Sequence, residues 1–161
     1  MLPYDTRESI GNRPSALLLA GKHQYLYAQK IVTGSVLDVG AGFCTLKEYL
    51  KDCDYTAIDG TEWIAKIGGA TYCDIMDYES EPFDYVCAFG VIESFDDLKP
   101  LADKLKSLAK YSVLFSFTPK CIREGLHDHT KEQVIESFGN CSFEPKPING
   151  EFFGRCDLCG Q

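Results

Sequence analysis

Short apolar segments alternate with amphipathic segments along most of the chain. Five segments of four to seven residues are rich in apolar residues, and each is followed closely by a glycine, a proline or an aspartate. Such segments are typical of strands that are covered on both faces of a parallel sheet. The pattern predicts strands over Ser35–Val39, Tyr55–Asp59, Ala70–Cys73, Phe83–Phe89 and Ser112–Phe117.

The segments between these strands carry apolar residues at helical spacing. The clearest is Leu98–Ala109, in which leucines recur on one side of the helix. Capping boxes that begin at Thr45 and Thr130 mark two further helix starts, because a threonine hydroxyl can accept the third backbone N–H. The pattern predicts helices over Pro14–Ile31, Thr45–Lys51, Glu62–Ile67, Leu98–Ala109 and Thr130–Phe138.

The order of these elements predicts the fold class. Strands that alternate with helices favour an α/β, Rossmann-like three-layer sandwich with a mostly parallel sheet. Near the C-terminus, Ser142–Glu144 and Glu151–Arg155 are expected to pair as an antiparallel hairpin. We expect a single domain over residues 1–161, with an N-terminal helical lid segment (residues 1–33) and a Rossmann-like core (residues 34–161).

Composition and charge restrict the partners. The chain has 161 residues, 16 of them basic and 24 acidic, for a net charge of −8. This balance argues against a nucleic-acid partner, whose phosphates need clustered Lys and Arg. No apolar run is long enough to cross a bilayer, and the N-terminus lacks a signal-peptide pattern. We expect a cytoplasmic protein with a small-molecule substrate, and a homodimer could complete its site.

Ligands of such sheets bind beyond the carboxyl ends of the strands, and three pieces of sequence fall there. The first is the turn Asp38–Gly42, whose glycines allow close approach of the backbone to a ligand. The second is Asp59 with Gly60; a carboxylate there can accept both hydroxyls of a ribose. The third is Asp74 with Ile75, which could contact an adenine. The alternatives are an ordinary turn, a helix cap and a surface loop.

The segment Val36-Leu37-Asp38-Val39-Gly40-Ala41-Gly42 resembles motif I of the class I S-adenosylmethionine-dependent methyltransferases. The later pieces resemble that family's ribose-binding acid, its adenine-contacting pair and its fourth strand, over roughly residues 35–118. The resemblance implies S-adenosylmethionine as cofactor, with Gly40 and Gly42 along its methionine portion and Phe89 and Gly90 near its sulfonium. The implied cofactor-binding residues are Asp38, Gly40, Ala41, Gly42, Asp59, Gly60, Asp74, Ile75, Phe89 and Gly90.

One position departs from the family's pattern. Cys44 stands where the third glycine of the motif is usual. A side chain is tolerated there if the start of the following helix stands slightly away from the cofactor. The missing glycine also argues against a dinucleotide, whose pyrophosphate needs the closest approach of the backbone.

Methyl transfer from a sulfonium is an in-line displacement, in which the enzyme aligns the reactants and excludes water. A catalytic side chain is needed only when the acceptor must lose a proton. The candidates are His127, His129 and Glu93, with solvated or capping roles as the alternatives. Tyr4, Tyr25 and Tyr27 could belong to a lid or to the core.

Three functions fit these features: a methyltransferase that acts on a small molecule, a cofactor-binding partner without catalysis, and another Rossmann-type nucleotide-cofactor enzyme. Nucleic-acid methyltransferases are disfavoured, because no Asn/Asp-Pro-Pro-aromatic turn or Pro-Cys pair follows the fourth strand. The pair Cys156 and Cys159 has no second Cys or His pair with which to complete a tetrahedral zinc site. We therefore expect no metal, and the pair is left without a role.

Overall fold

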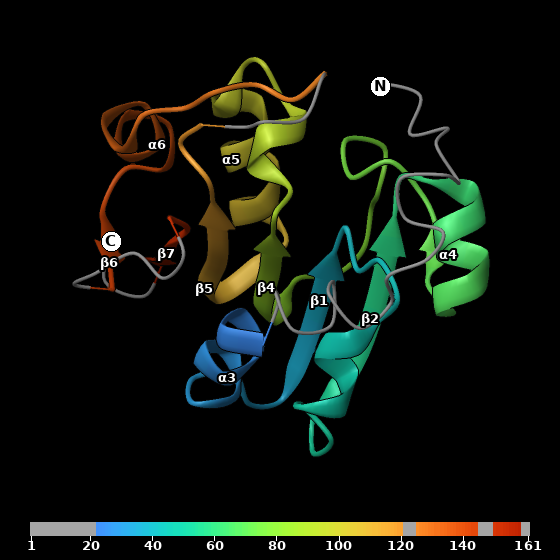
Figure 1. Ribbon diagram of the computed structural model, residues 1–161. Coiled ribbons are helices and arrows are strands. Elements are labelled where there is room, and N and C mark those ends of the chain that lie inside the picture. Colours follow the sequence, from blue (N-terminus) through green and yellow to red (C-terminus); the bar gives the residue numbers. More distant parts are fainter. Residues whose placement is uncertain (1–21, 121–124, 145–149, 159–161) are drawn as a thin grey trace.

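A computed structural model describes residues 22–120, 125–144 and 150–158 (Figure 1). These residues form one seven-stranded sheet in the order β3-β2-β1-β4-β5-β7-β6. The strands are β1 (Ser35–Val39), β2 (Asp54–Asp59), β3 (Thr71–Tyr72), β4 (Phe83–Phe89), β5 (Ala109–Phe117), β6 (Cys141–Phe143) and β7 (Phe152–Asp157). The described helices are α3 (Lys22–Gln29), α4 (Glu62–Gly68), α5 (Leu98–Ser107) and α6 (Lys131–Phe138), with 3-10 turns η1 (Thr45–Glu48) and η2 (Ile92–Ser94).

The pairing of the strands confirms the predicted fold class. Strands β1 to β5 pair in parallel, whereas β7 is antiparallel to both β5 and β6. The strand order reverses between β1 and β4, because β2 and β3 lie on one side of β1 while β4 and β5 follow on the other. A crevice for a ligand is expected beyond the carboxyl ends of the strands at such a reversal.

Side chains alternate between the two faces of the sheet, as the pleat requires. Leu37 and Val39 of β1 belong to the core that is shared with α5 and α6. Val36 belongs instead to a second core, which contains Ala28 of α3 and Leu46 of η1. Figure 1 shows α5 beside β4 and β5, with α6 next to α5. The described part of the chain therefore has helix, sheet and helix layers.

The predicted capping box at Thr45 is wrong. Cys44 precedes η1 in a left-handed conformation (φ 54°, ψ 32°), and no side chain caps the turn. Thr45 is therefore the first residue of the turn and not its N-cap, so its side chain does not form the expected box. The Thr45 side chain hydrogen-bonds to Tyr25 instead. The capping box at Thr130 is confirmed, since both of its reciprocal hydrogen bonds with Gln133 are present.

The boundary between α5 and β5 differs by a few residues from the predicted one, because contacts between distant parts of the chain determine it. Helix α5 ends at Ser107, and β5 begins at Ala109, three residues before the predicted strand. The cause is that Ala109 pairs with Phe83 and that the Phe83 N–H donates to the Leu108 carbonyl at 2.8 Å. The first part of the predicted helix Pro14–Ile31 lies outside the described residues, and its second part is α3.

Candidate functional site

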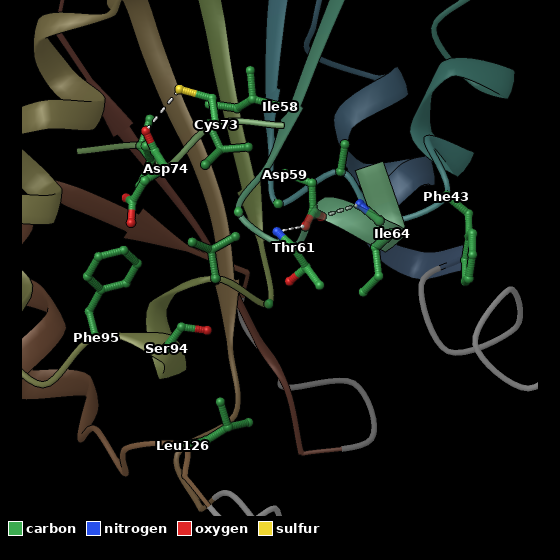
Figure 2. Close-up of a pocket in the computed structure, with 18 of the residues that line it drawn as sticks. Phe43, Ile58, Asp59, Thr61, Ile64, Cys73, Asp74, Ser94, Phe95 and Leu126 are labelled. Atoms are coloured by element: carbon green, nitrogen blue, oxygen red, sulfur yellow. Dashed lines mark hydrogen bonds between the residues drawn. The ribbon is translucent and has the colours of Figure 1, made fainter. Parts of the chain in front are cut away.

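A cavity of about 620 Å³ lies at the carboxyl ends of β1, β2, β3 and β4. The three pieces of sequence that were expected to bind a ligand all contribute to its lining, together with residues that follow β4 and β5. Figure 2 shows Asp59, Asp74, Phe95 and Leu126, from four separate parts of the chain, around this hollow. The sites predicted from the sequence therefore meet in space.

The glycine turn forms the wall of the cavity after β1. Gly40 has φ 65°, and a Cβ atom there would lie 2.6 Å from a methyl group of Val91, too close to be accommodated without movement. Gly42 has φ 56°, and a Cβ atom there would meet nothing within 4 Å. The first glycine thus permits close packing against Val91, and the second borders open space.

Asp59 joins the glycine turn to the start of α4. Asp59 is only 7% exposed. One carboxylate oxygen accepts the Gly42 N–H at 2.9 Å. The other accepts the Thr61 N–H at 2.8 Å, and this hydrogen bond is drawn as a dashed line in Figure 2. Thr61, not Asp59, is the N-cap of α4. A carboxylate has about four acceptor positions, so each oxygen keeps one for a hydroxyl group of a ligand.

Asp74 and Ile75 line the cavity in the segment that follows β3, which ends at Tyr72. The Asp74 carboxylate accepts the Met76 N–H at 3.0 Å, which closes a local turn. The Cys73 N–H donates to the Asp59 carbonyl at 3.0 Å, so the ends of β2 and β3 are held together. Ile75 is 5% exposed and belongs to the core. Asp77, the nearby acid, is exposed and does not line the cavity.

Asp38 lies beneath the turn and does not line the cavity. Its carboxylate accepts a hydrogen bond from the Tyr55 hydroxyl, which also hydrogen-bonds to the Cys44 thiol. Burial raises the pKa of Asp38 to about 7; the Tyr55 hydrogen bond opposes this shift, and the charge of Asp59 adds to it. The sequence contains no signal for this buried network, which supports the turn from below.

Phe89 also lies outside the cavity lining. Its ring packs against the core on the α3 side, whereas the preceding Ala88 belongs to the opposite core. The alternation of side chains along β4 explains this placement. The neighbouring Gly90 does line the cavity, and its N–H donates to the Ser116 hydroxyl at 3.1 Å.

The far side of the cavity contains one of the three catalytic candidates. His127 lines it, and Nδ1 of the imidazole lies 3.4 Å from a carboxylate oxygen of Asp96. The His127 N–H donates to the Glu93 carbonyl at 2.8 Å, which fixes the loop after β5 against η2.

The other two catalytic candidates do not line the cavity. Glu93 is 5% exposed, and its carboxylate accepts the Thr118 N–H at 2.6 Å. His129 is also 5% exposed, and its Nε2 lies 2.8 Å from the Phe95 carbonyl oxygen. Both side chains hold loops beside the cavity.

The tyrosines of the N-terminal segment separate in the structure. Tyr25 of α3 lines the cavity, and its ring lies 5.3 Å from that of Tyr49. Tyr27 packs against Phe153 at 6.1 Å between ring centroids and does not line the cavity. Tyr4 lies outside the described residues.

Several lining residues were not found from the sequence. They follow strands that come together only in the folded sheet, and they are Thr61, Ile64, Val91, Ser94, Phe95, Asp96 and Leu126. Val91 and Phe95 could have been found, because both follow β4 closely and are apolar residues in a loop. No signal in the sequence marks Leu126.

Comparison with known proteins identifies the fold. No protein-family model and no curated protein matches the sequence. The magnesium protoporphyrin IX methyltransferase ChlM from Synechocystis PCC 6803, with bound S-adenosylhomocysteine, matches with a TM-score of 0.69 at 13% identity, over 88% of this chain and 83% of its own. The N-methyltransferase NodS from Bradyrhizobium japonicum WM9, also with S-adenosylhomocysteine, matches with a TM-score of 0.70 at 15% identity, over 96% of each chain.

A third solved structure, the DhpI-SAM-HEP complex, matches with a TM-score of 0.71 at 14% identity, over 92% of this chain and 90% of its own. This chain has the class I S-adenosylmethionine-dependent methyltransferase fold. S-adenosylmethionine or its demethylated product is bound in all three of these structures. The cavity of this chain lies at the point where its strand order reverses, between β1 and β4.

Two further features of the described residues bear on the site. No helix among them is both long enough and apolar enough to span a bilayer. No three His, Cys, Asp or Glu side chains in residues 22–120, 125–144 and 150–158 converge in a way that could hold a metal ion.

Proposed function

We propose that this protein transfers a methyl group from S-adenosylmethionine to a small-molecule acceptor by in-line displacement. One observation carries the proposal: Asp59 accepts the Gly42 N–H at 2.9 Å, so the glycine turn and the acid at the end of β2 meet in one cavity. Asp74 and Gly90 complete that cavity from the ends of β3 and β4. The sequence resemblance and the fold support the same cofactor.

The lining fits the parts of this cofactor. Asp59 would hold the ribose, because each of its oxygens keeps an acceptor position for one hydroxyl. Asp74 would accept the adenine amino group, and Ile75 would pack against the ring. Gly40 and Gly42 would lie along the methionine portion, where the absent side chain of Gly42 leaves open space. Gly90 would lie near the sulfonium.

When bound, the cofactor supplies a methyl group on a positively charged sulfur that leaves as a neutral thioether. The residues of the chain then have to hold the acceptor in line and exclude water. Phe95 and Leu126 offer apolar surface for this purpose, on the side of the cavity that also contains His127. An acidic chain with net charge −8 suits a neutral or cationic acceptor better than a polyanion.

We assign His127 as the group that accepts a proton from the acceptor. Asp96 would favour the tautomer with the proton on Nδ1, since its carboxylate oxygen lies 3.4 Å from that nitrogen. The other ring nitrogen can then act as the base, because an imidazole can take a proton near neutral pH. Asp96 is in this sense a positioning residue.

Calorimetry tests the cofactor site. S-adenosylmethionine and S-adenosylhomocysteine should bind, and Asp59→Asn should weaken both about tenfold or more, because a hydrogen bond to a charged group contributes about 1.5–3 kcal/mol. Asp74→Asn should weaken both as well, by replacing an acceptor with a donor. The matched control is Asp77→Asn, three residues further on and outside the cavity, which should change nothing. Failure of both ligands to bind the wild-type protein would refute the proposal.

Release of S-adenosylhomocysteine over a panel of small acceptors tests turnover. Once an acceptor is found, His127→Gln should lower kcat and remove the acidic limb of the pH–rate profile, while affinity for S-adenosylhomocysteine stays the same. Asp96→Asn should lower the rate by a smaller factor. An unchanged pH–rate profile in His127→Gln would contradict the role of His127. Tighter binding of NAD than of S-adenosylmethionine would favour a different nucleotide enzyme.

A further inference from the structure

The two strands at the β6 edge of the sheet place a pair of cysteines face to face. Cys141 of β6 is the direct partner of Cys156 of β7. Further along the same ladder, the Glu144 N–H donates to the Phe153 carbonyl at 3.0 Å. Because hydrogen-bonded and non-hydrogen-bonded pairs alternate in antiparallel strands, the two cysteines form a non-hydrogen-bonded pair. Cα atoms in such pairs are about 4.5 Å apart, within the range that a disulfide spans.

The two side chains point toward one another. The Cys141 thiol hydrogen-bonds to Cys156, whose own sulfur lies 3.4 Å from the Phe138 carbonyl oxygen. Both are free thiols in the structure. The hydrogen bond from Cys141, helped by the Lys106 ammonium, lowers the pKa of the Cys156 thiol, although burial opposes this. A thiol of this kind reacts faster with oxidants, because the thiolate is the nucleophile.

The exposure of the pair limits what can reach it. Cys156 is only 3% exposed, whereas Cys141 is half-buried at the edge strand. A small oxidant such as hydrogen peroxide therefore suits the pair better than glutathione disulfide, whose bulk would require a larger displacement of the packing around Cys156. Neither cysteine lines the cavity, so the pair is separate from the candidate cofactor site.

We propose that Cys141 and Cys156 form a reversible redox site, in which a peroxide converts the facing thiols to a disulfide that joins β6 to β7. The Cys156 thiolate attacks one oxygen of hydrogen peroxide, and the O–O bond breaks. A sulfenic acid forms on Cys156, and the other oxygen leaves as hydroxide, which takes up a proton. The Cys141 sulfur then attacks the Cys156 sulfur and loses its proton, and a second water leaves. Two thiols and one peroxide thus give one disulfide and two waters.

The sequence pair Cys156 and Cys159 suggests a different partner for Cys156. The structure favours Cys141, which already hydrogen-bonds to Cys156 across the ladder. Cys159 lies outside the described residues. The experiment must therefore identify which two cysteines combine.

Titration of the full chain with hydrogen peroxide tests the proposal. Free thiols are counted after denaturation, and the disulfide is located by mass spectrometry of unreduced peptides. Two of the eight thiols should be lost, and dithiothreitol should restore them. The oxidised protein should unfold about 5 °C higher than the reduced one, because the bond closes a loop in the unfolded chain.

Three single variants make the test specific. Cys141→Ser should form no disulfide under the same titration and lose at most one of its seven thiols, since the sulfenic acid on Cys156 then lacks the facing thiol with which it condenses. Cys159→Ser should still lose two thiols. Cys53→Ser is the matched control, because Cys53 is also half-buried but lies against Val32 on the other face of the sheet, and it too should lose two thiols.

Three results would overturn the proposal: a disulfide between Cys156 and Cys159, a disulfide that survives in Cys141→Ser, or oxidation that leaves Cys141 and Cys156 unpaired. Peptide mapping of the wild-type protein distinguishes the first and the third of these outcomes without any variant. The conclusion therefore does not depend on how well a substituted chain folds.

Discussion

The close contact between α4 and the glycine turn makes Gly68→Ala a sharp test of how the site is built. Gly68 is the last residue of α4, and a Cβ atom there would lie 2.1 Å from the Gly42 carbonyl oxygen and 2.9 Å from the Phe43 Cα. Both are backbone atoms of the turn, so neither can rotate away as a side chain could. The extra methyl group must therefore push α4 and the turn apart.

The cost can be set against the gain in helix propensity. Forcing one methyl group into a packed site costs about 1–3 kcal/mol. Alanine is favoured over glycine inside a helix by about 1 kcal/mol, and less at a helix end. We expect a net loss of about 1–2 kcal/mol in the free energy of unfolding. Because the Gly42 N–H also binds Asp59, the displaced turn should lower affinity for S-adenosylhomocysteine about tenfold, equivalent to about 1.4 kcal/mol.

The matched control is the adjacent residue. Gly69 has φ 80°, and a Cβ atom there would meet nothing within 4 Å. Gly69→Ala should cost about 1 kcal/mol through backbone strain alone and leave affinity unchanged within about twofold. Urea unfolding and calorimetry on both variants measure the two effects. The reasoning is wrong if Gly68→Ala binds S-adenosylhomocysteine as tightly as Gly69→Ala does.

Three further changes test other parts of the structure. Asp38→Asn tests the raised pKa of Asp38, which is about 7 in the folded protein. In urea unfolding, the wild type should lose stability relative to this variant as the pH rises from about 4 to about 7, because the carboxyl group must then lose its proton in a buried site. A stability difference that does not change with pH would contradict this. Gly154→Ala should lower the free energy of unfolding by about 1–3 kcal/mol, since its Cβ atom would lie 2.4 Å from the fully buried Phe115 ring; wild-type stability would refute the clash. Ser116→Ala should cost about 1–3 kcal/mol in urea unfolding by removing the acceptor of the Gly90 N–H, and a neutral result would show that water replaces the hydroxyl.

Several features of the site depend only on the sequence near each residue, and these could be predicted. Asp59 is the last residue of β2, Asp74 lies two residues after β3, and the parallel sheet brings the carboxyl ends of strands together. Their presence in one cavity therefore followed from the order of the elements. The alternation along β4 would also have turned Phe89 away from the site, had it been applied to that residue.

Features that depend on contacts across the sheet were not predictable. Asp38 stands in a motif that suggested a ligand contact, yet its carboxylate binds the Tyr55 hydroxyl of the neighbouring strand β2. The same hydroxyl contacts Cys44, whose left-handed backbone replaces the expected capped helix with a 3-10 turn. The pattern of residues within one segment does not determine which side chains face each other across two paired strands. The roles of Asp38 and Thr45 were therefore not predicted correctly from their own segment.

The position of β7 between β5 and β6 has a consequence for the order in which the molecule can fold. Strand β6 precedes β7 in sequence but reaches the sheet only through it, because β5 and β6 are not neighbours. Until β7 docks, the outer side of the β5 backbone stays open from Ser112 to Phe117, next to the rings of Phe115 and Phe117. An open edge of this kind invites pairing with other chains. Intermediates populated before this last insertion should be the species most prone to aggregate.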